Sequence, residues 1–341
     1  MIHFDTDYMI GACPEIISRL ASTNMEQTSG YGDDPYSRRA KELILSACGL
    51  QDADVHFMVG GTQTNATVID GLLSKHAGVM AAENGHINVH EAGAIEAAGH
   101  KVLVLPSENG KVKAEDLATY IENFYADDTY PHMVAPGMLY ISFPTEYGTL
   151  YTLDELQALR NVCRNADIPL YIDGARLGYG IEARGNTVSL KDIAACADVF
   201  YIGGTKVGAL FGEAVVVPNR KLLRNFFPLM KQHGAVLAKG RLLGLQFETL
   251  FTDDLYFRLS RNAIERAMEI KQALLAKGYE PYADSPTNQQ IFYLPNEKID
   301  ELKQHVSFEL WGKRGGTRTP VRFVTDWSTS KEDTMQFISL L

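Results

Sequence analysis

The chain has 341 residues, 45% of them hydrophobic, which is long enough to bury a large core in one large domain and one smaller one. A formal net charge of −10 and a pI near 5.4, without a long basic stretch, argue against nucleic acid and anionic membranes as partners and favour a small molecule. Because the N-terminus carries acids where a signal peptide carries basic residues, and no run of about 18 apolar residues occurs, we expect a cytoplasmic protein without a membrane segment.

Strand-like and helix-like segments alternate through the first two thirds of the chain. A helix is expected from Asp34-Pro35, where an N-cap residue precedes a proline at the first helical position, to Gly49. Two further helix starts match the capping box, Thr152-Leu-Asp-Glu155 and Ser189-Leu-Lys-Asp192. A helix is also expected at residues 62–75, and apolar runs predict strands at residues 55–59, 79–82, 102–105, 138–143, 170–172, 199–202 and 214–217. This alternation predicts an α/β fold in which helices cover both faces of a mostly parallel sheet.

The pattern changes after about residue 240. A long helix is expected at residues 254–277, and shorter strands and helices follow at residues 290–294, 298–305, 321–325 and from Ser330 onward. We therefore predict two domains. Residues 1–245 form an N-terminal arm and a large domain, and residues 246–341 form a small C-terminal α+β domain.

Asp173 and Lys206 each follow an apolar strand-like run, in Leu-Tyr-Ile-Asp-Gly-Ala-Arg and Tyr-Ile-Gly-Gly-Thr-Lys. A lysine amine can close a Schiff base with the aldehyde of pyridoxal 5'-phosphate (PLP), and a carboxylate can keep the pyridine nitrogen of that cofactor protonated. Either residue alone is typical of an ordinary strand end. Together, and with the phosphate-loop candidate below, they predict a PLP site.

The segment Gly60-Gly61-Thr62-Gln63 follows a predicted strand and opens a predicted helix. Its backbone N–H groups and the Thr62 hydroxyl would converge at the positive end of a helix dipole, where a phosphate binds. A plain strand-to-helix turn would have the same sequence. No P-loop or dinucleotide fingerprint is present.

His86 lies just beyond a short strand, where its imidazole could stack on a flat cofactor. His90 shares a helix face with His86, so a metal pair is the rival interpretation. We expect no metal, because no cysteine cluster or suitably spaced carboxylate accompanies the two histidines. The four cysteines are scattered without a Cys-x-x-Cys pair, which predicts neither a zinc site nor a disulfide framework.

Arg176 follows Asp173 by three residues, close enough to serve the same cavity. An amino-acid substrate carries a carboxylate, which an arginine can bind with two parallel hydrogen bonds. Arg318 and Arg322, in the predicted small domain, offer the same group. A surface salt bridge is the alternative for each of these arginines.

These segments resemble the PLP enzymes of the aspartate aminotransferase fold type and, within them, the threonine aldolases of the β-eliminating lyase group. The resemblance runs nearly the full length, and the motifs that carry it are Thr6-Asp7, Tyr31-Gly32-Asp33-Asp34-Pro35, Gly61-Thr62-Gln63 with Asn65, His86, Asp173-Gly-Ala-Arg176, Lys206 and Val321-Arg322-Phe-Val-Thr. It implies a large PLP-binding domain followed by a small domain.

The resemblance also implies roles for these residues. Lys206 would carry PLP, Gly61 and Thr62 would hold its phosphate, and His86 would stack on its ring. Asp173 and Arg176 would bind the pyridine nitrogen and the substrate side of the cofactor, and Arg322 the substrate carboxylate.

Three further residues take roles from the resemblance. Thr6 falls in a substrate-binding motif of the arm. Tyr31 and Lys231 fall where family members reach across a subunit interface, Tyr31 towards the substrate and Lys231 towards the PLP phosphate. We therefore expect a dimer or tetramer with shared active sites.

The chain departs from the family pattern at two positions. Thr205 precedes the lysine in place of serine, and it keeps a hydroxyl for the cofactor. Glu146 stands where some aldolases have a second histidine, in Pro144-Thr145-Glu146-Tyr147-Gly148. A carboxylate could replace imidazole as a proton acceptor, and a structural glutamate is the alternative.

The resemblance implies a low-specificity aldolase that cleaves the Cα–Cβ bond of threonine or a related β-hydroxy-α-amino acid, giving glycine and an aldehyde. Lys206 would be the central catalytic residue, and His86, Glu146 or a bound water would accept the β-hydroxyl proton. A β-eliminating lyase or an aminotransferase would use the same lysine and aspartate, because the cofactor supplies the chemistry. A PLP-binding regulator is disfavoured, since the chain has no additional DNA-binding segment.

Overall fold

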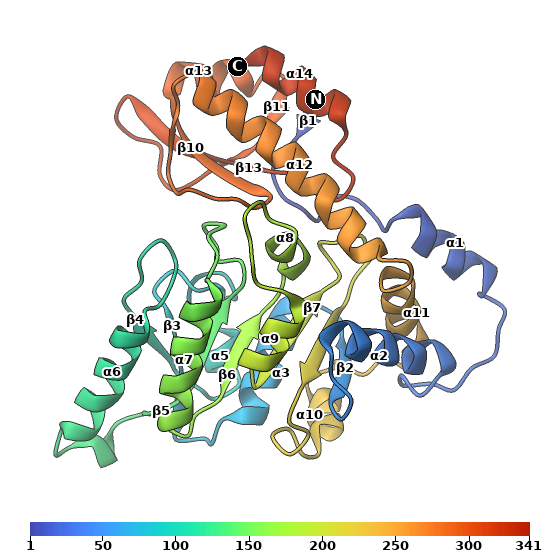
Figure 1. Ribbon diagram of the computed structural model, residues 1–341, viewed down its shortest axis with the longest axis vertical. Helices are drawn as coiled ribbons and strands as arrows, with labels where there is room; N and C mark the ends of the chain where they lie inside the picture. The colour runs from blue at the N-terminus through green and yellow to red at the C-terminus, as the bar shows by residue number, and fades with distance from the viewer.

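The computed structural model describes residues 1–341, which form a large α/β domain and a small domain joined by one long helix (Figure 1). The large domain contains a seven-stranded sheet in the order β2-β8-β7-β6-β5-β3-β4. Its strands are β2 (Asp54–Met58), β3 (Ala77–Ala82), β4 (Val102–Leu105), β5 (Ala135–Ser142), β6 (Leu170–Asp173), β7 (Val199–Gly203) and β8 (Glu213–Val217). β8 alone runs opposite to the other six strands, so the predicted mostly parallel sheet is confirmed.

Helices cover both faces of this sheet. They are α1 (Pro14–Ser22), α2 (Pro35–Cys48), α3 (Gly61–Leu72), α4 (His86–Val89), α5 (Ala94–Ala97), α6 (Ala114–Ala126), α7 (Leu153–Asn165), α8 (Leu177–Ile181), α9 (Leu190–Cys196), α10 (Phe226–Gln232) and α11 (Arg241–Leu250), with a 3₁₀ turn η1 at Tyr130–His132. Alternate strand residues enter two separate apolar clusters. Ile172 lies in one cluster and Tyr171 in the other, as expected when both faces are buried.

The predicted helix caps of α2, α7 and α9 are confirmed. Asp34 accepts a hydrogen bond from the Ser37 N–H at 2.8 Å, and α2 ends at Gly49, whose φ of 68° is in the left-handed region. Both predicted capping boxes are present, at the start of α7 and at the start of α9. These caps fix where each helix begins relative to the strand before it.

The small domain contains a four-stranded antiparallel sheet in the order β12-β13-β10-β9. Its elements are α12 (Leu255–Ala276), β9 (Glu280–Pro281), β10 (Gln289–Pro295), α13 (Asn296–Leu302), β11 (Val306–Ser307), β12 (Glu309–Leu310), β13 (Arg318–Val324) and α14 (Lys331–Leu340). Strand β1 (Ile2–His3) pairs in parallel with β11, so both chain termini lie on this domain (Figure 1).

Helix α12 connects the two cores. Tyr256 and Ile264, in its first half, pack with the large-domain core, whereas Ile270 and Leu274 pack with the small-domain core. The division between the cores therefore falls within α12, and the predicted boundary at residue 245 lies within α11. None of the helices combines the length and the apolar content needed to cross a membrane.

Candidate functional site

A cavity of roughly 310 Å³ opens at the edge of the large sheet where the parallel strands end. Because these strands are parallel, the residues just after them meet at one edge of the sheet. The cavity is lined by side chains and backbone from Tyr8, Gly61, Thr62, His86, Glu146, Asp173, Arg176, Thr205, Lys206 and Glu213, among others. Eight of the site residues predicted from the sequence thus line one cavity. The first of them, Gly61, and the last, Lys206, are more than 140 positions apart in the chain.

The N-terminus of α3 forms one end of the cavity. Its N-cap residue is Gly60, so no side chain caps the first turn. A Cβ on Gly61 would lie 3.3 Å from the Tyr201 hydroxyl, so glycine keeps the backbone accessible there. The first-turn N–H groups, the helix dipole and the adjacent Thr62 side chain are suited to an anionic group.

Asp173 is buried, lines the same cavity and accepts several hydrogen bonds. Oδ2 accepts from the Tyr140 hydroxyl at 2.6 Å and from the Asn65 amide at 2.9 Å, and Oδ1 accepts from the Ala175 N–H at 2.9 Å. Burial alone would raise the pKa of Asp173, but the positive charge of His86 and these hydrogen bonds hold it below its ordinary value. Asp173 is therefore an ionised carboxylate that can hold a cation.

His86 is positioned by two glutamates. Its Nδ1 lies 2.7 Å from Oε1 of the buried Glu91, and its backbone N–H donates to Glu146 Oε1 at 3.1 Å. The same Glu146 oxygen accepts a hydrogen bond from Ser142 at 2.7 Å. Burial raises the pKa of Glu146, so this carboxyl group can exchange a proton closer to neutral pH than an ordinary glutamate.

The rival metal interpretation of His86 rested on His90. The two rings have centroids 5.7 Å apart, and no group of three or more His, Cys, Asp or Glu side chains is arranged to hold a metal ion.

The Lys206 side chain lines the same cavity as Asp173 and the N-terminus of α3. Its Nζ lies 6.0 Å from the centre of the Tyr8 ring, and it forms no salt bridge. Burial, together with the nearby charge of Arg176, lowers the pKa of the Lys206 amine. A lowered pKa increases the fraction of neutral amine, which is the nucleophilic form.

Thr205, the residue before this lysine, does not have a free hydroxyl. Its Oγ1 donates to Glu213 Oε1 at 2.9 Å and accepts from the Gly212 N–H at 3.0 Å. Thr205 and the buried Glu213 thus both line the cavity and are hydrogen-bonded to each other.

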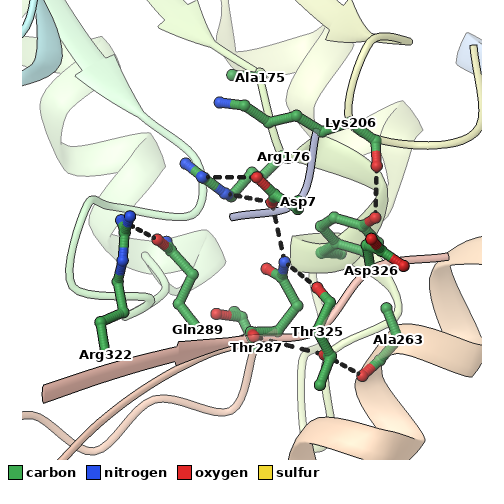
Figure 2. A network of polar contacts seen from close by, with 12 residues as sticks. Asp7, Ala175, Arg176, Lys206, Ala263, Thr287, Gln289, Arg322, Thr325 and Asp326 are labelled. Carbon is green, nitrogen blue, oxygen red and sulfur yellow. Dashed lines mark hydrogen bonds and ion pairs between the residues drawn. The ribbon is translucent and has the colours of Figure 1, made fainter. Parts of the chain in front are cut away.

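Arg176 is paired with the N-terminal arm. Its Nε and Nη2 donate to the two carboxylate oxygens of Asp7 at 2.7 and 2.9 Å, and Asn288 donates to the same carboxylate at 3.0 Å (Figure 2). Burial would raise the pKa of Asp7, but Arg176 holds it below its ordinary value. Nε and Nη2 of Arg176 are therefore already engaged by Asp7 and are not free to bind the carboxylate of a ligand. Thr6, next to Asp7, lines neither this cavity nor the neighbouring one.

A second cavity of roughly 310 Å³ adjoins the first and reaches the small domain. Arg322, on β13, donates from Nη1 to Gln289 at 3.1 Å and forms an ion pair with Glu309 through Nη2, and its guanidinium lies 5.0 Å from the centre of the Trp311 ring. Arg322 Nε and Gln289 Nε2 are buried donors without a partner. Two unpaired donors beside a cavity favour a site for an acceptor such as a carboxylate. Arg318 instead pairs with Glu280 at the surface.

Tyr31 and Lys231 lie together but away from both cavities. Lys231 Nζ is 4.3 Å from the centre of the Tyr31 ring. Neither residue lines either of these two cavities, and Tyr31 lines a separate, smaller one. Any contact of these two side chains with an active site would therefore have to be made in another subunit.

Several polar residues of the site were not predicted individually from the sequence. Glu91, Glu213 and Gln289 are nearly fully buried, and Asn65 joins Glu91 to Asp173 through its amide. For Glu213 the available signal was a polar residue at the start of an apolar strand, in Phe-Gly-Glu-Ala-Val-Val-Val, because a buried polar side chain needs a reason to be there.

Comparison with known proteins gives consistent matches over the whole chain. The model of the beta-eliminating lyase family matches residues 3–292. A low specificity L-threonine aldolase of Pseudomonas aeruginosa is 30% identical over 337 residues, which cover 96% of this chain and 94% of that protein. A protein of the same name from a Pseudomonas species is 31% identical over 333 residues, or 96% and 93% of the two chains.

Solved structures match as well. A Leishmania major threonine aldolase superposes with a TM-score of 0.97 at 38% identity, covering 100% of this chain and 98% of that one. A Thermus thermophilus aspartate aminotransferase superposes with a TM-score of 0.73 at 15% identity, over 100% of this chain and 90% of that one. The second match shows the shared fold alone.

Proposed function

Since the chain belongs to the beta-eliminating lyase family, we propose that it is a PLP-dependent aldolase of low specificity. Its reaction is cleavage of the Cα–Cβ bond of L-threonine, or of a related β-hydroxy-α-amino acid, to glycine and an aldehyde. One observation carries the proposal: Lys206, the ionised Asp173 and the uncapped N-terminus of α3 line one cavity. The aldolase names of the Pseudomonas and Leishmania relatives support the choice of substrate.

The side chains around this cavity fit PLP in charge and chemistry. The N-terminus of α3, with Gly61 and Thr62, would hold the phosphate, because its first-turn N–H groups have no capping side chain. Asp173 would hold the protonated pyridine nitrogen, and Lys206 would bind the aldehyde carbon. When bound, PLP supplies an electron sink for the electron pair of the broken Cα–Cβ bond.

The substrate carboxylate is assigned to the unpaired donors of the second cavity. Arg322 Nε and Gln289 Nε2 are buried without partners, and both residues line this cavity. Binding there would fix the orientation of the Cα–Cβ bond. Arg176 borders the same space, with its charge largely engaged by Asp7.

Glu146 is the candidate base for the β-hydroxyl proton. It lines both cavities, and burial raises its pKa, which makes it a better proton acceptor than an ordinary glutamate. The bonds from Ser142 and the His86 N–H hold one carboxylate oxygen and leave the other available. His86 Nδ1 is engaged by Glu91, which fixes the ring beside the cofactor position.

A second subunit completes the site in this proposal. Tyr31 and Lys231 line neither of the two cavities described above, and we assign both to the site of a partner subunit. Phe227 lines a small cavity together with Tyr31 and is half exposed, a large apolar side chain that an interface would cover. We therefore propose a dimer or tetramer in which Lys231 contacts the PLP phosphate of the partner.

The proposal is tested by Lys206→Ala, with Lys75→Ala as a matched control at an exposed lysine. The Lys206 variant is expected to lose the visible absorption of lysine-bound PLP and nearly all L-threonine turnover, while its circular dichroism and Tm stay unchanged. The control is expected to match the parent protein. A visible band that persists in Lys206→Ala would mean that another lysine carries the cofactor.

A further inference from the structure

Glu213, the first residue of β8, is a buried carboxyl group that the reaction proposed above does not use. Only 3% of its surface is exposed, and it lines the same cavity as Gly61, Thr62 and Lys206. Its hydrogen-bond partners are the neutral Thr205 hydroxyl and Gly204 N–H, and it forms no ion pair, although a buried carboxylate normally requires one. The group therefore needs either a cation or a proton to be stable where it lies.

The backbone and side chains before Lys206 hold this carboxyl group in place. Thr205 Oγ1 donates to Oε1 at 2.9 Å, and the Gly204 N–H donates to Oε2 at 3.2 Å. Thr205 is itself fixed by the Gly212 N–H at 3.0 Å. The orientation of Glu213 is thus set by the same short segment that carries the lysine.

Burial favours the neutral form of Glu213, and the neighbouring charges offset this effect only in part. The titratable groups that face it are Lys206, Asp173 and three buried tyrosines, namely Tyr171, Tyr201 and Tyr256. Lys206 is the only cation among them, and its amine is itself shifted towards the neutral form. Burial raises the pKa of Glu213 to about 8, so most of the group is protonated at neutral pH.

The phosphate assigned to the α3 N-terminus would bring another negative charge into this cavity. An ionised Glu213 would repel that phosphate and could offer it no hydrogen bond, because a carboxylate only accepts. A carboxylic acid has an O–H that can donate to a phosphate oxygen, and such a charge-assisted hydrogen bond is among the stronger ones.

We propose that Glu213 is a cofactor-binding residue that stays protonated and donates a hydrogen bond to the phosphate of PLP. The proposal rests on the proposed function, since it takes the cofactor from there. Thr205 then acts through Glu213: its hydroxyl orients the acid instead of contacting the phosphate directly.

The consequence is a defined pH dependence of cofactor affinity. Glu213 loses its proton as the pH rises through about 8, so the affinity of the apoprotein for PLP falls above that pH. At about pH 9.5 the protonated fraction is roughly one thirtieth, which predicts a rise in Kd of up to about 30-fold from this group. Glutamine has the same shape as glutamic acid and keeps a hydrogen-bond donor at every pH. Glu213→Gln therefore removes the part of the pH dependence of the PLP Kd that comes from this residue.

The test measures the Kd of PLP for apoprotein by fluorescence titration between about pH 6.5 and 9.5. The variants are Glu213→Gln and Glu213→Ala, and the control is Asp198→Asn, a part-buried carboxylate at the opposite end of β7. The ratio of the parent Kd to the Glu213→Gln Kd is expected to increase at least tenfold across this range. Glu213→Ala is expected to bind PLP about tenfold more weakly at pH 7, and the control is expected to follow the parent. The Tm of each apoprotein verifies that the variants fold.

Two results would overturn the inference. If the Kd of PLP for Glu213→Gln changes with pH as it does for the parent protein, the proton of Glu213 does not control PLP binding. If Glu213→Ala binds PLP more tightly than the parent at pH 7, Glu213 is ionised and repulsive. Absence of PLP binding by the parent protein at any pH would instead overturn the proposed function itself, and the inference with it.

Discussion

Replacement of Asp173 by asparagine removes one negative charge from the cavity and preserves the shape of the side chain. The three donors that converge on Asp173 are the Tyr140 hydroxyl, the Asn65 amide and the Ala175 N–H. An asparagine can accept from some of them, but its NH₂ group must face a donor. The variant therefore loses the charge that holds a pyridinium and gains one unfavourable contact.

The expected effect follows from the strength of one charge-assisted hydrogen bond. Such a bond contributes about 1.5–3 kcal/mol, and each 1.36 kcal/mol of activation free energy is about tenfold in rate. We therefore expect kcat for L-threonine to fall about 10- to 150-fold. KM is expected to change less, because the charge acts on the electron sink and not on substrate binding.

The assay measures aldehyde release at saturating PLP, together with the Kd of PLP, so that loss of cofactor is separated from loss of turnover. Asp198→Asn is the control, because Asp198 is a part-buried carboxylate that is paired with Arg160 and does not line the cavity. A kcat of Asp173→Asn within threefold of the parent, with PLP bound, would refute the role of Asp173.

Three further predictions concern the base, the substrate and the assembly. Glu146→Gln should lower kcat about 100-fold and remove the limb of the pH profile that rises as Glu146 loses its proton; an unchanged limb would assign the base elsewhere. Arg322→Lys should raise KM for L-threonine about 10- to 100-fold with a smaller change in kcat, and an unchanged KM would place the carboxylate elsewhere. Inactive Lys206→Ala, mixed and reassembled with inactive Tyr31→Phe/Lys231→Ala, should regain activity in heterodimers, whereas no recovery would contradict shared sites.

Local signals were sufficient to predict most of the large domain. The Asp34 cap, the two capping boxes and the apolar runs each depend on neighbouring residues, and each is present in the structure. The direction of β8 was not predictable in this way, because an apolar run has the same pattern in parallel and antiparallel strands. The pairing of β1 with β11 likewise joins segments about 300 residues apart.

The same distinction applies to the site. Lys206 and Asp173 could be placed together from their positions at strand ends, because parallel strands bring such residues to one edge. The pairing of Arg176 with Asp7 and the contact between Thr205 and Glu213 depend on tertiary packing. Arg176 was predicted to bind a ligand carboxylate, and the structure gives it a carboxylate from its own chain, which no local pattern signals.

The most direct test of the proposed function is identification of the products formed from L-threonine by the PLP-loaded protein, with Lys206→Ala as the control. An aldolase produces glycine and acetaldehyde in equal amounts, without ammonia, and the control produces neither. Ammonia and 2-oxobutanoate without glycine would contradict the proposal and would assign a β-elimination to the same site.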